Sequence, residues 1–208
     1  MGTKFSHFSI LNSTIEEATE LLQLMPKKTN FYEMMKRLSP ESAEEFKKLE
    51  DCGDKNIEMA MRRMNSQKRE YFIGKNHDWT TVFSEEFGFE SIDNYSLILS
   101  KKSNKTFLTV GLFDEDVFTL SVIKIGEILT HNVSGDAEAY EMKQSLGNSA
   151  IFAETFNIVP RKDELEQILE SNDEDLYKKI MELEKLFNMK LWINRSAPKE
   201  MGWKKVVV

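Results

Sequence analysis

Three histidines, His7, His77 and His131, carry the side chains that could act as general bases or bind a transition metal near neutral pH. Each lies on or beside a segment with the alternation of a β-strand. If those segments met, three imidazoles could hold a zinc ion that keeps an open coordination position. Their spacing is not that of metal ligands, however, so the pattern favours the simpler interpretation of polar residues at the edges of a sheet.

Two groups of carboxylates follow predicted strands. Asp114, Glu115 and Asp116 share one turn, and Glu85 and Glu86 end another strand. Oxygen ligands of this kind suit calcium or magnesium, but the spacing of an EF-hand loop is missing, and turns favour Asp for local hydrogen bonds. If both groups lie at one end of the sheet, they form an acidic edge that attracts a basic partner. We therefore take all five as candidate binding residues, without a metal.

Tryptophan and cysteine are the two further residue types that could take part in binding or chemistry. Trp79 could stack on a base or a sugar, although its alternation also suits a core position, and we include it among the candidate binding residues. Trp203, in a basic tail, is the tryptophan expected to be free for contacts. Cys52 is the single cysteine, so no intrachain disulfide can form, and no histidine lies near it in sequence to lower the pKa of its thiol.

The short motifs of the commonest enzyme classes are missing. The sequence contains no GxxxxGK[ST], GxGxxG, HExxH or GxSxG pattern. We therefore expect no cofactor and, on balance, no enzymatic activity.

Composition narrows the class of protein. The chain has 208 residues, of which 40% are hydrophobic and 11% aromatic, enough for a sizeable core. A net charge of −7 argues against a nucleic-acid-binding protein. The sequence has no run of 18 apolar residues, so we expect no membrane span, and the first residues lack the pattern of a signal peptide. Together with the lone cysteine, these features predict a cytoplasmic protein.

Hydrophobic periodicity predicts an α+β fold with a mainly antiparallel sheet. Strands are expected over 4–11 and 70–85, and the clearest signal is a three-strand meander over about 105–133, with an amphipathic middle strand and a sheet covered on both faces. Thr14 and Glu17 form a capping box that begins a helix. The remaining expected helices are one capped by Ser91, a short one over 137–145, one near Pro160, and one capped by Asn172.

These elements predict a single α+β domain over 1–195, with the helical segment 30–67 as an insertion or cover. Residues 196–208 are expected to form a loosely ordered basic tail. An edge strand or the methionine-rich helical segment could also support a homodimer.

Part of the chain, about residues 76–190, resembles a group of uncharacterised cytosolic proteins of Gram-positive bacteria. The resemblance rests on the segments DWTTVFSEEFGF and LILSKKSNKTFLTVGLFDEDVFTLSVIKIGEILTHNVSG. It carries over no catalytic residue. It implies binding to another protein, since similar small acidic proteins of such bacteria include immunity proteins that neutralise a toxin.

The sequence thus favours a protein-interaction module, an inhibitor or immunity-type protein whose acidic surface meets a basic protein partner. The alternative is a small-molecule-binding protein or enzyme with a pocket between sheet and helices that uses His7, His77 or His131. Binding to nucleic acid through the basic tail is the weakest hypothesis, because five positive charges give only weak, salt-sensitive binding.

Overall fold

The computed structural model describes residues 4–25, 69–88, 91–171 and 175–208. The chain divides into two compact units, one made of Met1–Leu24 with Glu70–Val208 and the other of Met25–Arg69. The description below concerns the first unit. The predicted helical segment 30–67 lies outside the described residues.

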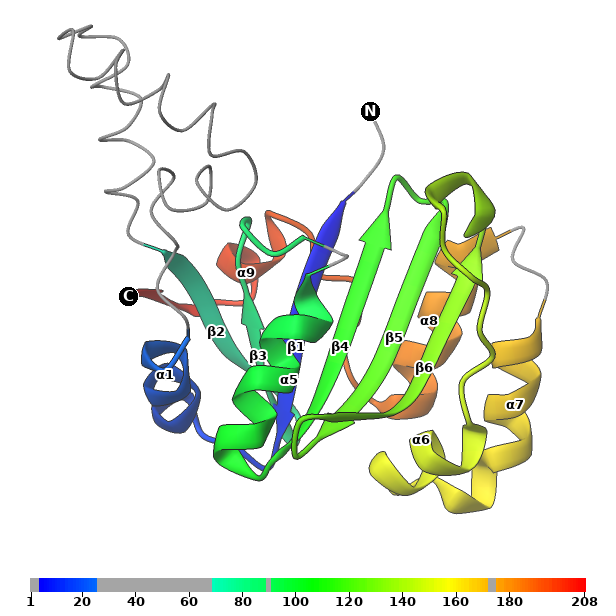
Figure 1. Cartoon of the computed structure of the whole chain (residues 1–208), viewed down its shortest axis with the longest axis horizontal. Coiled ribbons are helices and arrows are strands. Elements are labelled where there is room, and N and C mark those ends of the chain that lie inside the picture. The colour runs from blue at the N-terminus through cyan, green and yellow to red at the C-terminus, as the bar shows by residue number, and fades with distance from the viewer. Residues whose placement is uncertain (1–3, 26–68, 89–90, 172–174) are drawn as a thin grey trace, which may run out of the picture. The chain divides into compact units, whose positions relative to one another are not determined.

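A seven-stranded antiparallel sheet forms the centre of the unit, with the strand order β6-β5-β4-β1-β3-β2-β7 (Figure 1). The strands are β1 (Phe5–Leu11), β2 (Glu70–Asn76), β3 (Trp79–Phe83), β4 (Thr106–Phe113), β5 (Val117–Lys124), β6 (Glu127–Gly135) and β7 (Lys204–Val207). The predicted α+β fold and the meander β4-β5-β6 are confirmed.

Helices cover both faces of this sheet. On one face lie α1 (Ile15–Gln23) and α5 (Ile92–Ser103) (Figure 1). The opposite face packs against α6 (Ser149–Thr155), α7 (Lys162–Glu170) and α8 (Leu176–Phe187). The short helix α9 (Ala197–Glu200) precedes β7, and two 3-10 turns span Glu138–Tyr140 and Val159–Arg161.

Because both faces of the sheet are covered, the strand residues that point to either face are buried. On the α8 side, Leu108, Leu120 and Phe118 join one core with Phe152 and Leu183. Every residue of β5 from Val117 to Ile123 is buried. The prediction of an amphipathic middle strand is therefore wrong, because β5 lies between neighbours in a sheet that is packed on each face.

On the α1 and α5 side, Phe87 occupies the middle of an aromatic cluster. Its ring lies 5.5 Å from Phe8, 5.8 Å from Tyr71 and 5.7 Å from Tyr95, measured between centroids. Phe8 also contacts Phe107 at 5.7 Å. Such tilted pairs stabilise the core beyond the area they bury.

Several predicted helix boundaries need correction. Ser91 has a helical conformation and its hydroxyl donates to the Gly88 carbonyl rather than capping α5. Asp175, not Asn172, caps α8, since its carboxylate accepts from the Lys178 amide at 2.9 Å. The helix expected over 137–145 is only the turn Glu138–Tyr140, followed by an isolated bridge from Ser145 to Val133.

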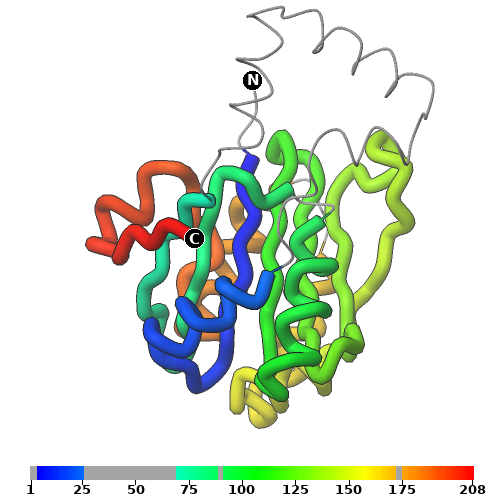
Figure 2. Tube along the Cα trace, turned by 60° about the vertical axis from the view of Figure 1, so that its left-hand side comes forward, coloured from blue at the N-terminus to red at the C-terminus, as the bar shows by residue number. Residues whose placement is uncertain are grey.

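The C-terminal residues are part of the sheet. Strand β7 pairs antiparallel with β2, from Glu70 opposite Val207 to Ile73 opposite Lys204 (Figure 2). Trp203 packs on Gly74, where any side chain would overlap its indole ring. The prediction of a loosely ordered tail over 196–208, with Trp203 free for contacts, is therefore wrong: Lys199 lies in α9, and Lys204 and Lys205 lie in the edge strand β7.

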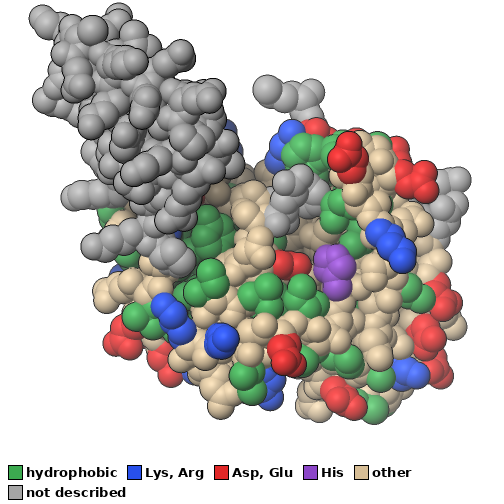
Figure 3. Space-filling model, viewed as in Figure 1, with side chains coloured by type: hydrophobic (Ala, Val, Ile, Leu, Met, Phe, Trp, Pro, Cys, Tyr) green, Lys and Arg blue, Asp and Glu red, His purple; other side chains and the backbone are tan. Residues whose placement is uncertain are grey.

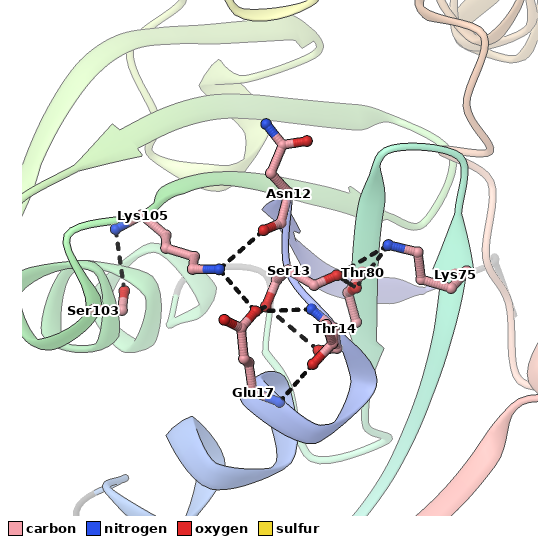
Figure 4. Close-up of polar contacts among 8 residues, drawn as sticks. All are labelled: Asn12, Ser13, Thr14, Glu17, Lys75, Thr80, Ser103 and Lys105. Atoms are coloured by element: carbon pink, nitrogen blue, oxygen red, sulfur yellow. Dashed lines mark hydrogen bonds and ion pairs between the residues drawn. The ribbon is translucent and has the colours of Figure 1, made fainter.

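The capping box predicted for α1 is present and belongs to a larger polar network (Figure 4). The Glu17 carboxylate accepts hydrogen bonds from the Thr14 amide at 2.9 Å and from the Ser13 hydroxyl at 3.0 Å. Lys105 pairs with Glu17 at 2.7 Å and also donates to the Asn12 carbonyl. The hydrogen bond from Lys105, followed by those from Thr14 and Ser13, lowers the pKa of Glu17 to about 2.

Replacing Lys105 should release this carboxyl group. In Lys105→Met we expect the pKa of Glu17 to rise from about 2 toward its ordinary value of 4.5, because the largest cause of the shift is removed. An NMR titration of the Glu17 side chain measures the change. Lys102→Met is the matched control, since Lys102 donates to the Leu24 carbonyl at the other end of α1. An unchanged pKa in Lys105→Met would contradict the assigned cause.

Candidate interaction site at one end of the sheet

The position of β1 brings the two acidic turns to the same end of the sheet. Strand β1 pairs antiparallel with β3 on one side and with β4 on the other. Strands β3 and β4 therefore run in the same direction and finish together. Glu85 and Glu86 follow the end of β3, and Asp114 to Asp116 follow the end of β4. Acidic side chains are visible at this end, above β4 and β5 (Figure 3).

We call these five residues, Glu85, Glu86, Asp114, Glu115 and Asp116, the acidic end. Next to it lies a cleft of about 940 Å³. It opens where β1 and β3 stop pairing, since their ladder finishes at His7 opposite Phe83, whereas the β1–β4 ladder continues to Phe5 opposite Leu112. The cleft is lined by Lys4, Phe5, Ser6, Phe83, Ser84, Glu85, Phe87, Gly88, Leu112, Phe113, Asp114, Asn194, Arg195 and Ser196.

Two ion pairs border the cleft. Lys4 lies 3.2 Å from the Asp114 carboxylate and 3.8 Å from the centroid of the Phe113 ring. Arg195 lies 2.9 Å from the Glu85 carboxylate, and its side chain is 76% exposed. Exposed pairs of this kind contribute less than about 1 kcal/mol, so a charged ligand group can replace either member at little cost.

The β4–β5 turn has an unusual backbone. Asp114 and Glu115 adopt left-handed conformations, with φ of 52° and 67°. The Asp116 amide donates to the Phe113 carbonyl at 3.0 Å and closes this three-residue turn between the paired residues Phe113 and Val117.

The same turn has a negative electrostatic environment. The Tyr140 hydroxyl donates to the Asp116 carboxylate at 2.9 Å, and the Asp136 amide donates to the Asp116 carbonyl at 2.8 Å. The hydrogen bond to Asp116, with the negative charges of Asp114 and Asp136, raises the pKa of Tyr140 to about 12.

Trp79 does not belong to this site. It begins β3, at the opposite end of the strand from Glu85, and only 3% of it is exposed. Its ring packs against Phe156 at 5.3 Å between centroids. Trp79 is a core residue, in agreement with its alternation along the strand.

The three histidines do not converge. His7 is buried on the α8 side of the sheet, where its Nε2 lies 2.9 Å from the Leu191 carbonyl oxygen. His77 occupies the β2–β3 turn with φ of 56°. His131 lies on β6 and reaches the opposite face, toward α5. In the part of the chain that the structure describes, no group of three or more His, Cys, Asp or Glu side chains could hold a metal ion.

His131 belongs to a second polar cluster. Ser121 donates to the Asp93 carboxylate at 2.9 Å, and its oxygen lies 2.7 Å from His131 Nδ1. Thr109 donates to the other oxygen of the same carboxylate. Because Ser121 has a single proton, the Nδ1–H of the neutral imidazole must donate to Ser121, which leaves Nε2 as an acceptor. A histidine side chain is visible at the surface of this face (Figure 3).

This cluster is not a nucleophilic triad. Ser121 and Asp93 both approach the same nitrogen of His131, Nδ1, at 2.7 and 3.7 Å. In a serine nucleophile triad, the serine and the carboxylate bind opposite nitrogens of the ring. Ser121 is also buried and its hydroxyl is already engaged by Asp93 and His131, so it is not available to a substrate. The cluster orients the imidazole of His131 and leaves Nε2 as its chemically available atom.

Sequence reasoning missed the cations and the hydroxyl of the cleft as well as the partners of His131. Lys4 and Ser6 are far from Arg195 in the chain, and none of the three belongs to a motif. Asp93 lies 28 residues before Ser121 and resembles an ordinary acidic residue in the first turn of a helix. Only the strand order of the sheet brings these residues together.

Comparison with known proteins gives no match, since neither a family model, nor a curated protein, nor a solved structure is similar to the chain. Among the residues that the structure describes, no helix has the length and apolarity needed to cross a membrane.

Proposed function

We propose that this chain is a protein-interaction module, an inhibitor or immunity-type protein, that binds a basic partner through the acidic end. The observation that carries the proposal is the convergence of two acidic turns beside one cleft. Together with Lys4 and Arg195, the five carboxylates of the acidic end have a formal charge of −3. Such a field accelerates the encounter with a positively charged surface and orients it.

The backbone of the β4–β5 turn supports the proposal. The left-handed conformations of Asp114 and Glu115 and the hydrogen bond from the Asp116 amide to the Phe113 carbonyl make a tight turn that holds three carboxylates together. The net charge of −7 acts in the same direction over longer distances. A cytoplasmic location is part of the proposal, for which the lone Cys52 is the motivation.

Charge-neutral variants test the proposed function. Capture from a lysate of the source cells at low salt should recover a stoichiometric basic partner. The double variant Glu115→Gln, Asp116→Asn should bind that partner at least about tenfold more weakly, and binding by the wild type should weaken as salt rises. The matched control is Glu16→Gln, Glu20→Gln, which removes the same charge from exposed positions on α1.

Two results would overturn the proposed function. One is that both double variants bind the partner equally well. The other is that no stoichiometric partner is recovered while the purified protein turns over a metabolite.

The second candidate function is a small-molecule-binding protein or enzyme that uses His131. The observation that favours it is the hydrogen-bond chain from Asp93 through Ser121, which fixes the orientation of the imidazole. A ligand screen by thermal unfolding tests it, because a bound ligand raises the melting temperature. This function requires a compound that stabilises the wild type but not His131→Gln. It is rejected if the stabilising compounds act on both proteins alike.

A further inference from the structure

The cleft contains an unsatisfied hydroxyl group. Ser6 lines the cleft and is only 1% exposed, and its Oγ has no hydrogen-bond partner among the residues that the structure describes. A buried polar atom without a partner is destabilising, so a polar atom of a ligand would gain by reaching it. Elsewhere in the lining of the cleft, Phe5, Phe87 and Leu112 supply apolar contact surface.

The first residues of β1 extend past the end of the β1–β3 ladder, and we call the side that faces β3 there the open edge of β1. In an antiparallel ladder, alternate residues direct both their N–H and C=O groups to the same side. The β1–β4 ladder includes Phe5 and Ser6, whereas the β1–β3 ladder ends at His7. One of Phe5 and Ser6 must therefore direct its backbone groups toward β3, past the end of that ladder. An extended chain can pair with such groups as an added strand.

From these two observations we propose that the cleft binds an extended peptide segment of the partner, with an apolar side chain inside the cleft and a basic side chain beside it. The segment would pair with the open edge of β1 and place a polar atom against Ser6. Within the cleft, Glu85 and Asp114 are paired with Arg195 and Lys4, so the formal charge of −3 at this end comes from the neighbouring Glu86, Glu115 and Asp116. These carboxylates beside the cleft select a basic neighbour over an acidic one. A volume of about 940 Å³ leaves space for such a segment.

This inference rests on the proposed function, because it specifies what the same end of the sheet recognises. Three synthetic peptides test it with the full chain: Lys-Leu-Phe-Leu-Lys, its counterpart with Glu at both ends, and the first peptide with N-methylated backbone amides. We expect the basic peptide to shift the NMR signals of the residues that line the cleft. It should bind at least about tenfold more tightly than the other two peptides.

A pair of serine variants separates the cleft from general effects on stability. Ser6 and Ser96 both have a buried hydroxyl without a partner in the described part of the chain, but of the two only Ser6 lines the cleft. Ser6→Ala should lower the affinity for the basic peptide about three- to tenfold, because one hydrogen bond is lost. Ser96→Ala should leave this affinity unchanged.

The inference is overturned if N-methylation has no effect, if the shifted signals lie away from the cleft, or if Ser6→Ala and Ser96→Ala bind the basic peptide alike. These outcomes differ from failure of the proposed function. The proposed function fails if the Glu115→Gln, Asp116→Asn variant binds the whole partner as well as the wild type does.

Discussion

Acidification from about pH 7 to about pH 4 is expected to remove about 3 kcal/mol from the free energy of unfolding through His7 alone. Burial lowers the pKa of His7 from 6.5 to about 4, and the hydrogen bond to the Leu191 carbonyl only partly offsets this effect. The unfolded chain therefore takes up a proton near pH 6.5, whereas the folded protein does so only near pH 4. Stability is lost as the pH falls through this window, at about 1.4 kcal/mol for each unit of pKa difference.

The variant His7→Gln isolates this contribution. Its amide can donate to the Leu191 carbonyl but does not titrate, so stability between about pH 6.5 and 4.5 should no longer depend on residue 7. Urea unfolding across that range gives the slope. His77→Asn is the matched control, because Asn tolerates the left-handed backbone at that position. An NMR titration of His7 in the wild type provides an independent measurement.

The account of His7 is wrong if His7→Gln keeps the wild-type slope, or if the His7 imidazole titrates near pH 6.5. The upper part of the window separates His7 from Glu17. The pKa of Glu17 is lowered from 4.5 to about 2, so its contribution is lost only at lower pH.

The second large effect is expected from Gly135→Ala. Gly135 has φ of 94°, and a Cβ atom there would overlap the Asp116 carbonyl oxygen and lie 2.9 Å from Leu176. Backbone strain and overlap together should lower the free energy of unfolding by about 3 kcal/mol. The overlap would push the backbone of Asp116 away from residue 135, so the affinity of the acidic end for its partner should fall as well.

Gly202→Ala separates the overlap from the backbone strain. Gly202 also has positive φ, at 65°, but a Cβ atom there meets nothing within 4 Å. This variant should lose only the 1–2 kcal/mol or so that a left-handed alanine costs. Urea unfolding compares the two variants, and equal losses would show that contact with the Asp116 turn is unimportant.

Most helices and strands could be predicted because the spacing of apolar residues along a segment depends on which side of that segment is buried. The alternation over 105–133 and the capping box at Thr14 both predicted structure that the protein has. The prediction of an amphipathic β5 failed because alternation of polar and apolar residues along one strand does not show that its polar positions are also buried, although the apolar residues of the meander did predict a sheet covered on both faces. The prediction of a loosely ordered tail failed because the pairing of β7 with β2 involves the contact between Gly74 and Trp203, residues that are far apart in the chain.

The candidate site was predictable only in part. The acidic residues were identified from the sequence, but their meeting at one end depends on β1 lying between β3 and β4. Hydrophobic periodicity determines which face of a strand is buried and contains no information on strand order. The cleft and the cluster of Asp93, Ser121 and His131 follow from that order, which explains why neither could be predicted.

The most direct test of the account is hydrogen exchange of the wild-type protein, free and bound to its captured partner, resolved by residue. We predict slower exchange in the bound state at residues 4–6, 84–88 and 112–116, the segments of the cleft and the acidic end. Protection confined instead to the middle of the face that α5 covers, around His131, would contradict the central claim that the partner binds at this end of the sheet.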